Sequence, residues 1–335
     1  MKKKTELKEN WDENLRALQQ LKEELDAVEI KREVQGAAWR KELAFLDDMV
    51  GMEPIKQRLL DLGRYMGWTR WMAAHGNDVS LYPTPNLTFL FLGEPGTGKT
   101  TLAKHMGDIL YSMGLIRRKE VFIYRREDLV GENYGCEEEL TREALESSRD
   151  AVLVLDEAYQ CFKNSSDRRD PAYHILETLM AEFGEPGRCI ILAGYKDEMM
   201  ELMQVNPGFR SRIPEENILL FSGPSEEALF EIVDRRLGSM KMRMTPDAKR
   251  LLHRSIHEQY VRRDRSFGNA RQMCQMADAI LFTHAQRFME SLQSNDCSSH
   301  SDSLLINSVE MQTCLDRQSS VLQTIKTKRS SIGFA

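Results

Sequence analysis

The chain has 335 residues, of which 41% are hydrophobic and 29% charged, and its formal net charge is −6. This length and composition allow two domains with buried cores and argue against wholesale disorder. The acidic balance argues against a dedicated nucleic-acid binder, whose surface is usually basic. No apolar stretch approaches the length of a membrane span, and the start "MKKKTELKEN" lacks the apolar region of a signal peptide.

Six cysteines are scattered along the chain, without a C-x-x-C pair or a cysteine–histidine cluster at zinc spacing. Scattered thiols of this kind are typical of a reducing compartment. We therefore expect a cytoplasmic protein, with a nuclear location as the alternative, and no membrane partner.

Residues 1–40 are predicted to form a charged, amphipathic, coiled-coil-like helix. Its apolar residues recur at alternating spacings of four and three, and Asn14 takes the one polar position of this repeat. The apolar positions are Leu7, Trp11, Leu18, Leu21, Leu25 and Val28. About three heptads are marginal for a coiled coil. Packing on the body of the same chain and self-association therefore both remain open.

Between residues 41 and 221, short apolar runs alternate with helical patterns. We expect strands at residues 87–93, 121–124, 151–156, 189–195 and 218–221, with helical patterns after the first, second and third of them. Strands that alternate with helices of this length predict an α/β domain with a five-stranded parallel sheet flanked by helices.

After residue 221 the strand patterns stop, and residues 222–292 are predicted to form a small all-helical domain. Thr245 and Pro246 fit a helix N-cap followed by proline at the first helical position. The last predicted helix begins near Asn269. Residues 293–303, "QSNDCSSHSDS", are predicted to be a polar linker, and residues 304–335 a weakly patterned tail.

The stretch "GEPGTGKT" at residues 93–100 fits the pattern G-x-x-x-x-G-K-[ST] between a predicted strand and a predicted helix. Its glycines allow backbone N–H groups to surround phosphate oxygens, Lys99 can reach the β- and γ-phosphates, and Thr100 can bind Mg²⁺. We therefore expect ATP and Mg²⁺ as cofactors. The predicted nucleotide-binding residues are Gly93, Glu94, Pro95, Gly96, Thr97, Gly98, Lys99, Thr100 and Thr101.

Asp156 and Glu157 follow the apolar run "AVLVL", so their carboxylates are expected at the carboxyl edge of the sheet, where α/β proteins bind ligands. Asp156 would bind Mg²⁺ directly or through water, and Glu157 would polarise the attacking water. Alone, such a pair is often a strand that meets solvent. Behind a phosphate loop, the catalytic interpretation is favoured.

Together these motifs resemble those of the AAA+ ATPases, in particular the group of the red-type Rubisco activase CbbX and the stage V sporulation protein K. The resemblance covers residues 46–281 and is carried by "GEPGTGKTTLAK", "REDLVGENYG", "VLVLDEAY", "LAGYKDEM", "NPGFRSRI" and "GNAR". It implies a P-loop NTPase fold with a helical lid domain. It also implies a ring, usually a hexamer, in which ATP hydrolysis pulls or remodels a protein client.

The same resemblance implies roles for residues outside the phosphate motif. Val50 and Gly51 would pack near adenine. Tyr195 would occupy the position where many family members sense the γ-phosphate with Asn or Thr, and Arg271 would contact the γ-phosphate of its own chain. The alternatives are a tyrosine that caps a buried strand and an ordinary surface arginine.

Arg210 and Arg212, in "NPGFRSRIP", would lie at a subunit boundary according to the resemblance. At least one would contact the ATP of the adjacent subunit and stabilise charge on the transferring phosphoryl group. The sequence leaves open which arginine does so. The alternative is a local ion pair with Glu215 or Glu216, which would be individually weak.

Tyr134 and Gly135 occupy the position of the family's pore loop, where an aromatic residue grips an extended client peptide. The relatives usually carry a basic residue after it, whereas this chain reads "CEEEL". The departure puts any small-molecule regulator in doubt and favours a client other than Rubisco. The alternative is a helix start enriched in acids, which the helix dipole favours.

Two other functions remain open. Arginines between residues 235 and 265 would suit an AAA+ protein that acts on nucleic acid as an initiator or loader, although many of them alternate with acids. A nucleotide-controlled scaffold with slow hydrolysis is the other alternative, and intact Lys99, Asp156 and Glu157 argue against it. The expected partners are thus copies in a homo- or hetero-hexamer and a protein client.

Overall fold

The computed structural model describes residues 38–47, 49, 51–131, 135–162, 171–205, 207–265, 267–293 and 302–317. The helix expected over residues 1–40 lies almost entirely outside these ranges. The described residues form two compact units. The sheet unit contains most of residues 38–219, and the lid unit contains residues 220–317 together with the short segments 49–52 and 92–99.

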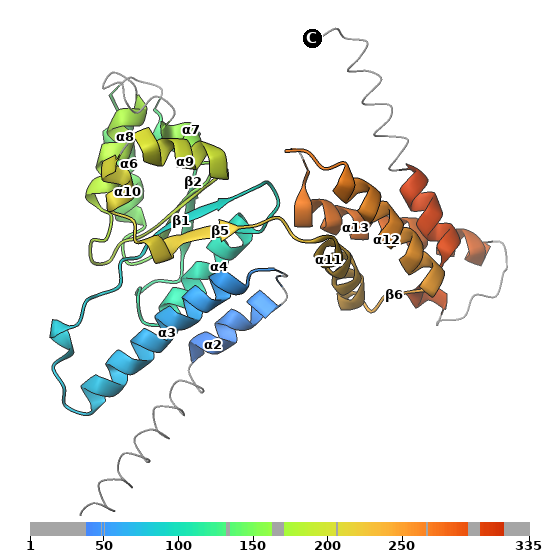
Figure 1. The fold of residues 1–335 in the computed structure, drawn as a ribbon, viewed down its shortest axis with the longest axis horizontal. Coiled ribbons are helices and arrows are strands. Elements are labelled where there is room, and N and C mark those ends of the chain that lie inside the picture. Colours follow the sequence, from blue (N-terminus) through green and yellow to red (C-terminus); the bar gives the residue numbers. More distant parts are fainter. Residues whose placement is uncertain are drawn as a thin grey trace, which may run out of the picture. The chain divides into compact units, whose positions relative to one another are not determined.

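A five-stranded parallel sheet, in the order β2-β3-β4-β1-β5, confirms the predicted fold class (Figure 1). Its strands are β1 (Thr88–Gly93), β2 (Val121–Tyr124), β3 (Val152–Leu155), β4 (Cys189–Gly194) and β5 (Ile218–Phe221). The three inner strands β1, β3 and β4 are buried along their whole length, whereas β2 and β5 at the edges are partly exposed. Continuous apolar runs are typical of parallel strands that are covered on both faces.

Helices connect and cover these strands, as the alternating pattern predicts. They are α2 (Ala38–Leu43), η1 (Ala44–Asp47), α3 (Glu53–Ala74), η2 (Val79–Leu81), α4 (Lys99–Ser112), α5 (Arg126–Leu129), α6 (Glu137–Ser147), α7 (Tyr159–Phe162), α8 (Pro171–Ala181), α9 (Lys196–Val205), α10 (Pro207–Ser211) and η3 (Glu215–Asn217). On α4, the side chains of Leu102, Met106, Ile109 and Leu110 are completely buried, because they recur on one helical face.

Three long helices form the lid unit: α11 (Glu226–Ser239), α12 (Pro246–Val261) and α13 (Asn269–Gln293) (Figure 1). The predicted start of α12 is confirmed, since the Thr245 side chain accepts a hydrogen bond from the Ala248 N–H and Pro246 is the first helical residue. The core of the unit is aliphatic and methionine-rich, with Leu229, Val233, Leu252, Ile256, Met273 and Ile280 among its buried residues.

The lid unit also includes the described part of the predicted tail. This part comprises η4 (Asp302–Leu304), β7 (Leu305–Ile306) and the helical residues 308–317. β7 pairs in parallel with β6 (Arg243–Met244), and the Thr245 N–H donates to the Ile306 carbonyl at 3.0 Å. Ile306, Met311 and Cys314 lie in the lid core. The core residues of this segment are divided between a two-residue strand and a short helix, so neither periodicity runs long enough to stand out in the sequence, where residues 304–335 read as weakly patterned.

A buried ion pair fastens this segment to α13. His284 Nδ1 lies 3.1 Å from Glu310 Oε2, and both side chains are almost fully buried. The contact with Glu310 raises the pKa of His284 above its usual range. Burial alone would raise the pKa of Glu310, but the contacts with His284, the Asn307 N–H and the charge of Arg287 lower it below its usual range.

We predict that residues 302–317 become less firmly attached to α13 as the pH rises through the raised pKa of His284. The stabilisation from charged His284 is complete below its unfolded-state value near 6.5 and is lost above its folded-state pKa. The stabilisation from ionised Glu310 is present above its unfolded-state value near 4.5 and is lost only in acid. Hydrogen exchange of residues 302–317, corrected for the intrinsic rate, measures this effect.

The control is Glu310→Gln, which keeps the size of the side chain and removes its charge. In this variant the loss of protection at alkaline pH should largely disappear. Equal pH profiles for the wild type and Glu310→Gln would show that the pair contributes no pH dependence.

Candidate nucleotide-binding site

The predicted phosphate loop connects β1 to α4, as its motif requires. Gly96 and Gly98 have φ values of +69° and +98°, in the left-handed region that favours glycine. Lys99 is buried at the start of α4, and its Nζ donates to the carbonyls of Gly93 at 2.7 Å and Glu94 at 2.9 Å. The Thr97 hydroxyl donates to the Glu94 carbonyl at 2.8 Å. The loop thus curls around the ammonium group of Lys99.

Both left-handed glycines are also in close contact with their neighbours. A Cβ atom on Gly96 would lie 2.0 Å from the Gly268 carbonyl oxygen, and one on Gly98 would lie 2.7 Å from the terminal methyl carbons of Met49 and Met52. The left-handed glycines let backbone N–H groups turn toward a ligand, and the lysine and the helix N-terminus add further donors. Together they form the set of hydrogen-bond donors that a nucleoside triphosphate needs. The residues present therefore fit the phosphates of ATP.

Other predicted nucleotide contacts surround this loop. Arg271 lies in the first turn of α13, and its Cβ is 3.0 Å from the position that a Cβ on Gly96 would take. Gly51, with φ +82°, belongs to the segment whose methionines contact Gly98. Thr100 and Thr101 are in the first turn of α4. Val50 lies outside the described residues.

Asn269 at the start of α13 is a loop contact that the sequence analysis did not identify. Its side-chain Nδ2 donates to the Pro95 carbonyl at 3.0 Å. In the sequence, the motif "GNAR" points only to its arginine. An asparagine at the start of a helix is common, so the residue type alone gives no signal for this contact.

Asp156 and Glu157 follow β3 in the sheet unit, at the carboxyl edge where they were expected. The Asp156 N–H donates to the Tyr124 carbonyl at 2.9 Å, and its carboxylate lies 4.0 Å from the Arg125 guanidinium. Glu157 has a φ of +53°, a left-handed conformation that is unusual for a residue other than glycine. Backbone strain of this kind is often found at functional sites.

Two hydrogen bonds hold Glu157 and the residue that follows it in place. Its carboxylate accepts a hydrogen bond from Gln160 Nε2 on α7, and the Gln160 carbonyl in turn accepts one from Arg126 Nη1 on α5 at 2.9 Å. The Ala158 N–H donates to the Ala193 carbonyl at 2.9 Å, which links the Asp-Glu turn to the end of β4.

Tyr195 directly follows β4, and its ring stacks on Tyr159 with centroids 5.3 Å apart. Since β3 and β4 are parallel neighbours, Asp156, Glu157 and Tyr195 lie at the same edge of the sheet unit. A tyrosine hydroxyl there can bind a water molecule or a phosphate oxygen.

The two arginines of "FRSRI" have different environments. Arg210 Nη2 donates to Glu215 Oε1 at 2.8 Å, and Arg210 Nη1 donates to the Ile213 carbonyl at 3.2 Å. The exposed Arg212 donates to the Gly208 carbonyl at 2.9 Å, and no carboxylate among the described residues lies within ion-pair distance of it. The local ion pair considered as an alternative thus exists for Arg210 and not for Arg212.

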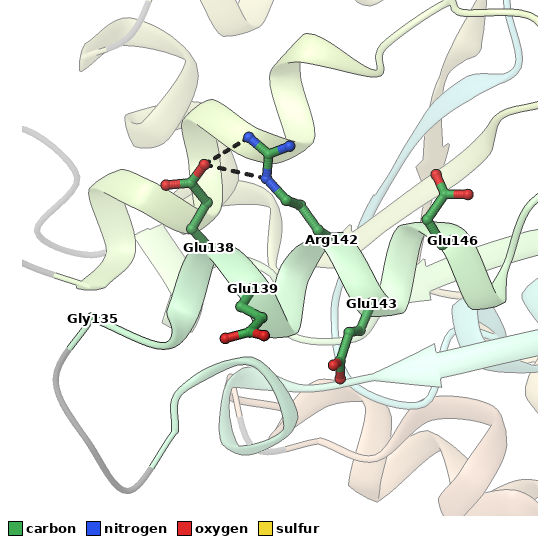
Figure 2. A pocket seen from close by; sticks show the side chains of 6 residues that line it. All are labelled: Gly135, Glu138, Glu139, Arg142, Glu143 and Glu146. Carbon is green, nitrogen blue, oxygen red and sulfur yellow. Dashed lines mark hydrogen bonds and ion pairs between the residues drawn. The ribbon is translucent and has the colours of Figure 1, made fainter.

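Gly135 begins the described chain after the predicted pore residue Tyr134, which lies outside the described residues. Gly135 has a φ of +98°, and its N–H donates to Glu137 Oε2 at 2.9 Å. Beside it, along α6, is an open pocket of about 490 Å³ (Figure 2), lined by Gly135, Glu138, Glu139, Arg142, Glu143 and Glu146. Four of these six residues are glutamates, and Arg142 offsets only Glu138, to which it donates at 2.7 Å, so the surface next to the predicted pore loop is mainly acidic.

Comparisons with known proteins agree with this geometry. Residues 89–215 match the ATPase family associated with various cellular activities (AAA), and residues 225–317 match the AAA lid domain. The second match includes the segment 302–317 that packs into the lid core. Among the described residues, no helix is long and apolar enough to cross a membrane.

Curated relatives and a solved structure extend this result. Protein CbbX of Cereibacter sphaeroides is 34% identical over 265 residues, which cover 78% of this chain and 83% of the relative. The chloroplastic ribulose bisphosphate carboxylase/oxygenase activase of Cyanidioschyzon merolae is 32% identical over 245 residues, which cover 72% and 80%. The FIGL-1 AAA domain, at 17% identity, shares the fold with a TM-score of 0.51 over 84% of this chain and 88% of that one. The phosphate loop, the parallel sheet, the lid and these relatives show that the chain belongs to the CbbX group of AAA ATPases and is a nucleotide-binding ATPase.

Proposed function

We propose that this ATPase requires Mg²⁺, assembles into a ring, in the simplest case a hexamer, and uses ATP hydrolysis at subunit interfaces to thread or remodel a protein client. The observation that carries the proposal is the exposed Arg212, a guanidinium without a carboxylate partner among the described residues. Such a group is suited to a negative charge on a neighbouring subunit.

In this proposal, one chain supplies the phosphate contacts. The loop from Gly93 to Thr101, which includes Lys99, would bind the phosphates. Arg271 would contact the γ-phosphate, and residues 50–51 would pack near adenine. Thr100 and Asp156 offer the hydroxyl and carboxylate oxygens that Mg²⁺ prefers as ligands. Bound Mg²⁺ would neutralise charge on the phosphate oxygens.

Glu157 is then the residue that accepts a proton from the attacking water. Its left-handed backbone and the hydrogen bond from Gln160 orient the carboxylate before a nucleotide arrives. Tyr195, at the same edge of the sheet unit, would bind the water or a phosphate oxygen through its hydroxyl.

The neighbouring subunit would supply Arg212 in trans. Arg210 is the weaker candidate because its guanidinium already pairs with Glu215 and with a backbone carbonyl. We therefore assign to Arg210 the local role of ordering the turn that presents Arg212.

The client would be gripped by Tyr134 and Gly135. A protein client is supported by the relative whose name is ribulose bisphosphate carboxylase/oxygenase activase. The acidic surface along α6 beside Gly135 supports a client other than Rubisco for this chain. Trapping Glu157→Gln with ATP in cells and identifying the proteins that co-purify would name it.

We predict that Gly96→Ala impairs ATP binding more than Gly98→Ala. Both substitutions put an alanine in the left-handed region, at a cost of about 1–2 kcal/mol. If the free loop relaxes to avoid this strain, ATP binding has to restore the conformation, and the affinity falls on the order of tenfold. The new methyl group on Gly98 meets only the flexible ends of two methionines, whereas the one on Gly96 meets the rigid backbone of Gly268. Titration with a fluorescent ATP analogue measures both affinities.

Thermal unfolding of the two variants without nucleotide serves as the control for folding. Equal losses of affinity in the two variants would contradict the contact between Gly96 and Gly268.

A second prediction concerns the trans arginine. Arg212→Ala should lower ATP turnover by roughly 10³–10⁵-fold while nucleotide binding persists, and Arg210→Ala should lower it far less. Mixing Arg212→Ala with Lys99→Ala should restore part of the turnover, because Lys99→Ala subunits bind no ATP but still present Arg212 to their neighbours. Phosphate release in each mixture measures the effect.

The matched control mixes Arg212→Ala with the double variant Lys99→Ala/Arg212→Ala, which should stay inactive. Full turnover in Arg212→Ala alone, or equal turnover in the two mixtures, would refute hydrolysis across a subunit interface.

A further inference from the structure

Asn269 joins the lid helix α13 to the phosphate loop through a single side chain. The residue is only 7% exposed. Its Nδ2 donates both to the Pro95 carbonyl at 3.0 Å and to the Phe267 carbonyl at 3.2 Å. One amide group thus bonds the loop and the segment that leads into α13.

The backbone of Asn269 explains why asparagine suits this position. Its φ of +46° lies in the left-handed region, which glycine and asparagine adopt more readily than other residues. Glycine would accept the conformation but would lack the amide. Aspartate has the same size, but its carboxylate would face two carbonyl oxygens without a proton to donate. Asparagine meets both requirements.

The consequence reaches Arg271, which lies two residues further along. Gly268, next to Asn269, is in close contact with Gly96. A Cβ atom on Gly96 would lie 2.0 Å from the carbonyl oxygen of Gly268 and 3.0 Å from the Cβ of Arg271. The hydrogen bond from Asn269 to Pro95 therefore fixes the first turn of α13 against the loop that binds the phosphates.

We propose that Asn269 is a positioning residue of the ATP site, whose side-chain amide couples the lid to the phosphate loop and sets the approach of Arg271 to the γ-phosphate. The inference rests on the proposed function, since it assigns Asn269 a role in binding ATP. It makes the preference for ATP over ADP depend on a residue that contacts no phosphate itself.

The test uses Asn269→Gly, which keeps the left-handed backbone, removes the amide and adds no charge. It should weaken binding of a slowly hydrolysed ATP analogue by about threefold to tenfold, as expected for one hydrogen bond. Binding of ADP should change less, because ADP has no γ-phosphate for Arg271 to contact. Fluorescence titrations with both nucleotides measure this difference.

A double-mutant cycle with Arg271→Ala separates positioning from a general effect on the fold. If Asn269 acts through Arg271, the double variant Asn269→Gly/Arg271→Ala should bind the ATP analogue as Arg271→Ala does. Additive losses, or equal losses for ATP and ADP, would overturn the inference.

Lys99→Ala distinguishes failure of the inference from failure of the proposed function. If Lys99→Ala abolishes nucleotide binding while Asn269→Gly binds as the wild type does, only the coupling through Asn269 is overturned. If Lys99→Ala binds ATP normally, the proposed site is wrong and the role of Asn269 fails with it.

Discussion

Parallel pairing of β3 with β4 is the constraint on which the proposed catalytic site of this protein depends. Parallel strands end at the same edge of a sheet, so the residues that follow them are brought together without any contact in sequence. Tyr195 reaches the same edge as Asp156 and Glu157 although it lies far from them along the chain. The Ala158–Ala193 hydrogen bond then ties the two strand ends together.

Much of this arrangement could be predicted from the sequence, because its signals are local. Uninterrupted apolar runs predict the inner strands, and the phosphate loop has a motif whose glycines match the left-handed φ values of Gly96 and Gly98. The cap at Thr245 followed by Pro246 also depends only on neighbouring residues. Where the physical cause lies within a few residues, the sequence was sufficient.

The remaining features depend on contacts between distant segments. Arg210 and Arg212 are the same residue type, so the sequence does not distinguish them. Only the folded turn shows that Glu215 accepts a hydrogen bond from Arg210. The apolar residues of the segment 302–317 are divided between a two-residue strand and a short helix, so their place in the lid core follows from pairing with β6, about sixty residues earlier. Asn269 likewise gives no signal until Pro95 is beside it.

The left-handed backbone at Glu157 has a consequence for the evolution of this chain. A residue other than glycine in that conformation costs about 1 kcal/mol or more, and glycine at the same position would relieve the strain. Glycine cannot carry a carboxylate, so if Glu157 acts in hydrolysis as proposed, selection for hydrolysis would keep the protein less stable than a simple exchange could make it. Random variants selected for thermal tolerance alone should therefore drift toward loss of this carboxylate.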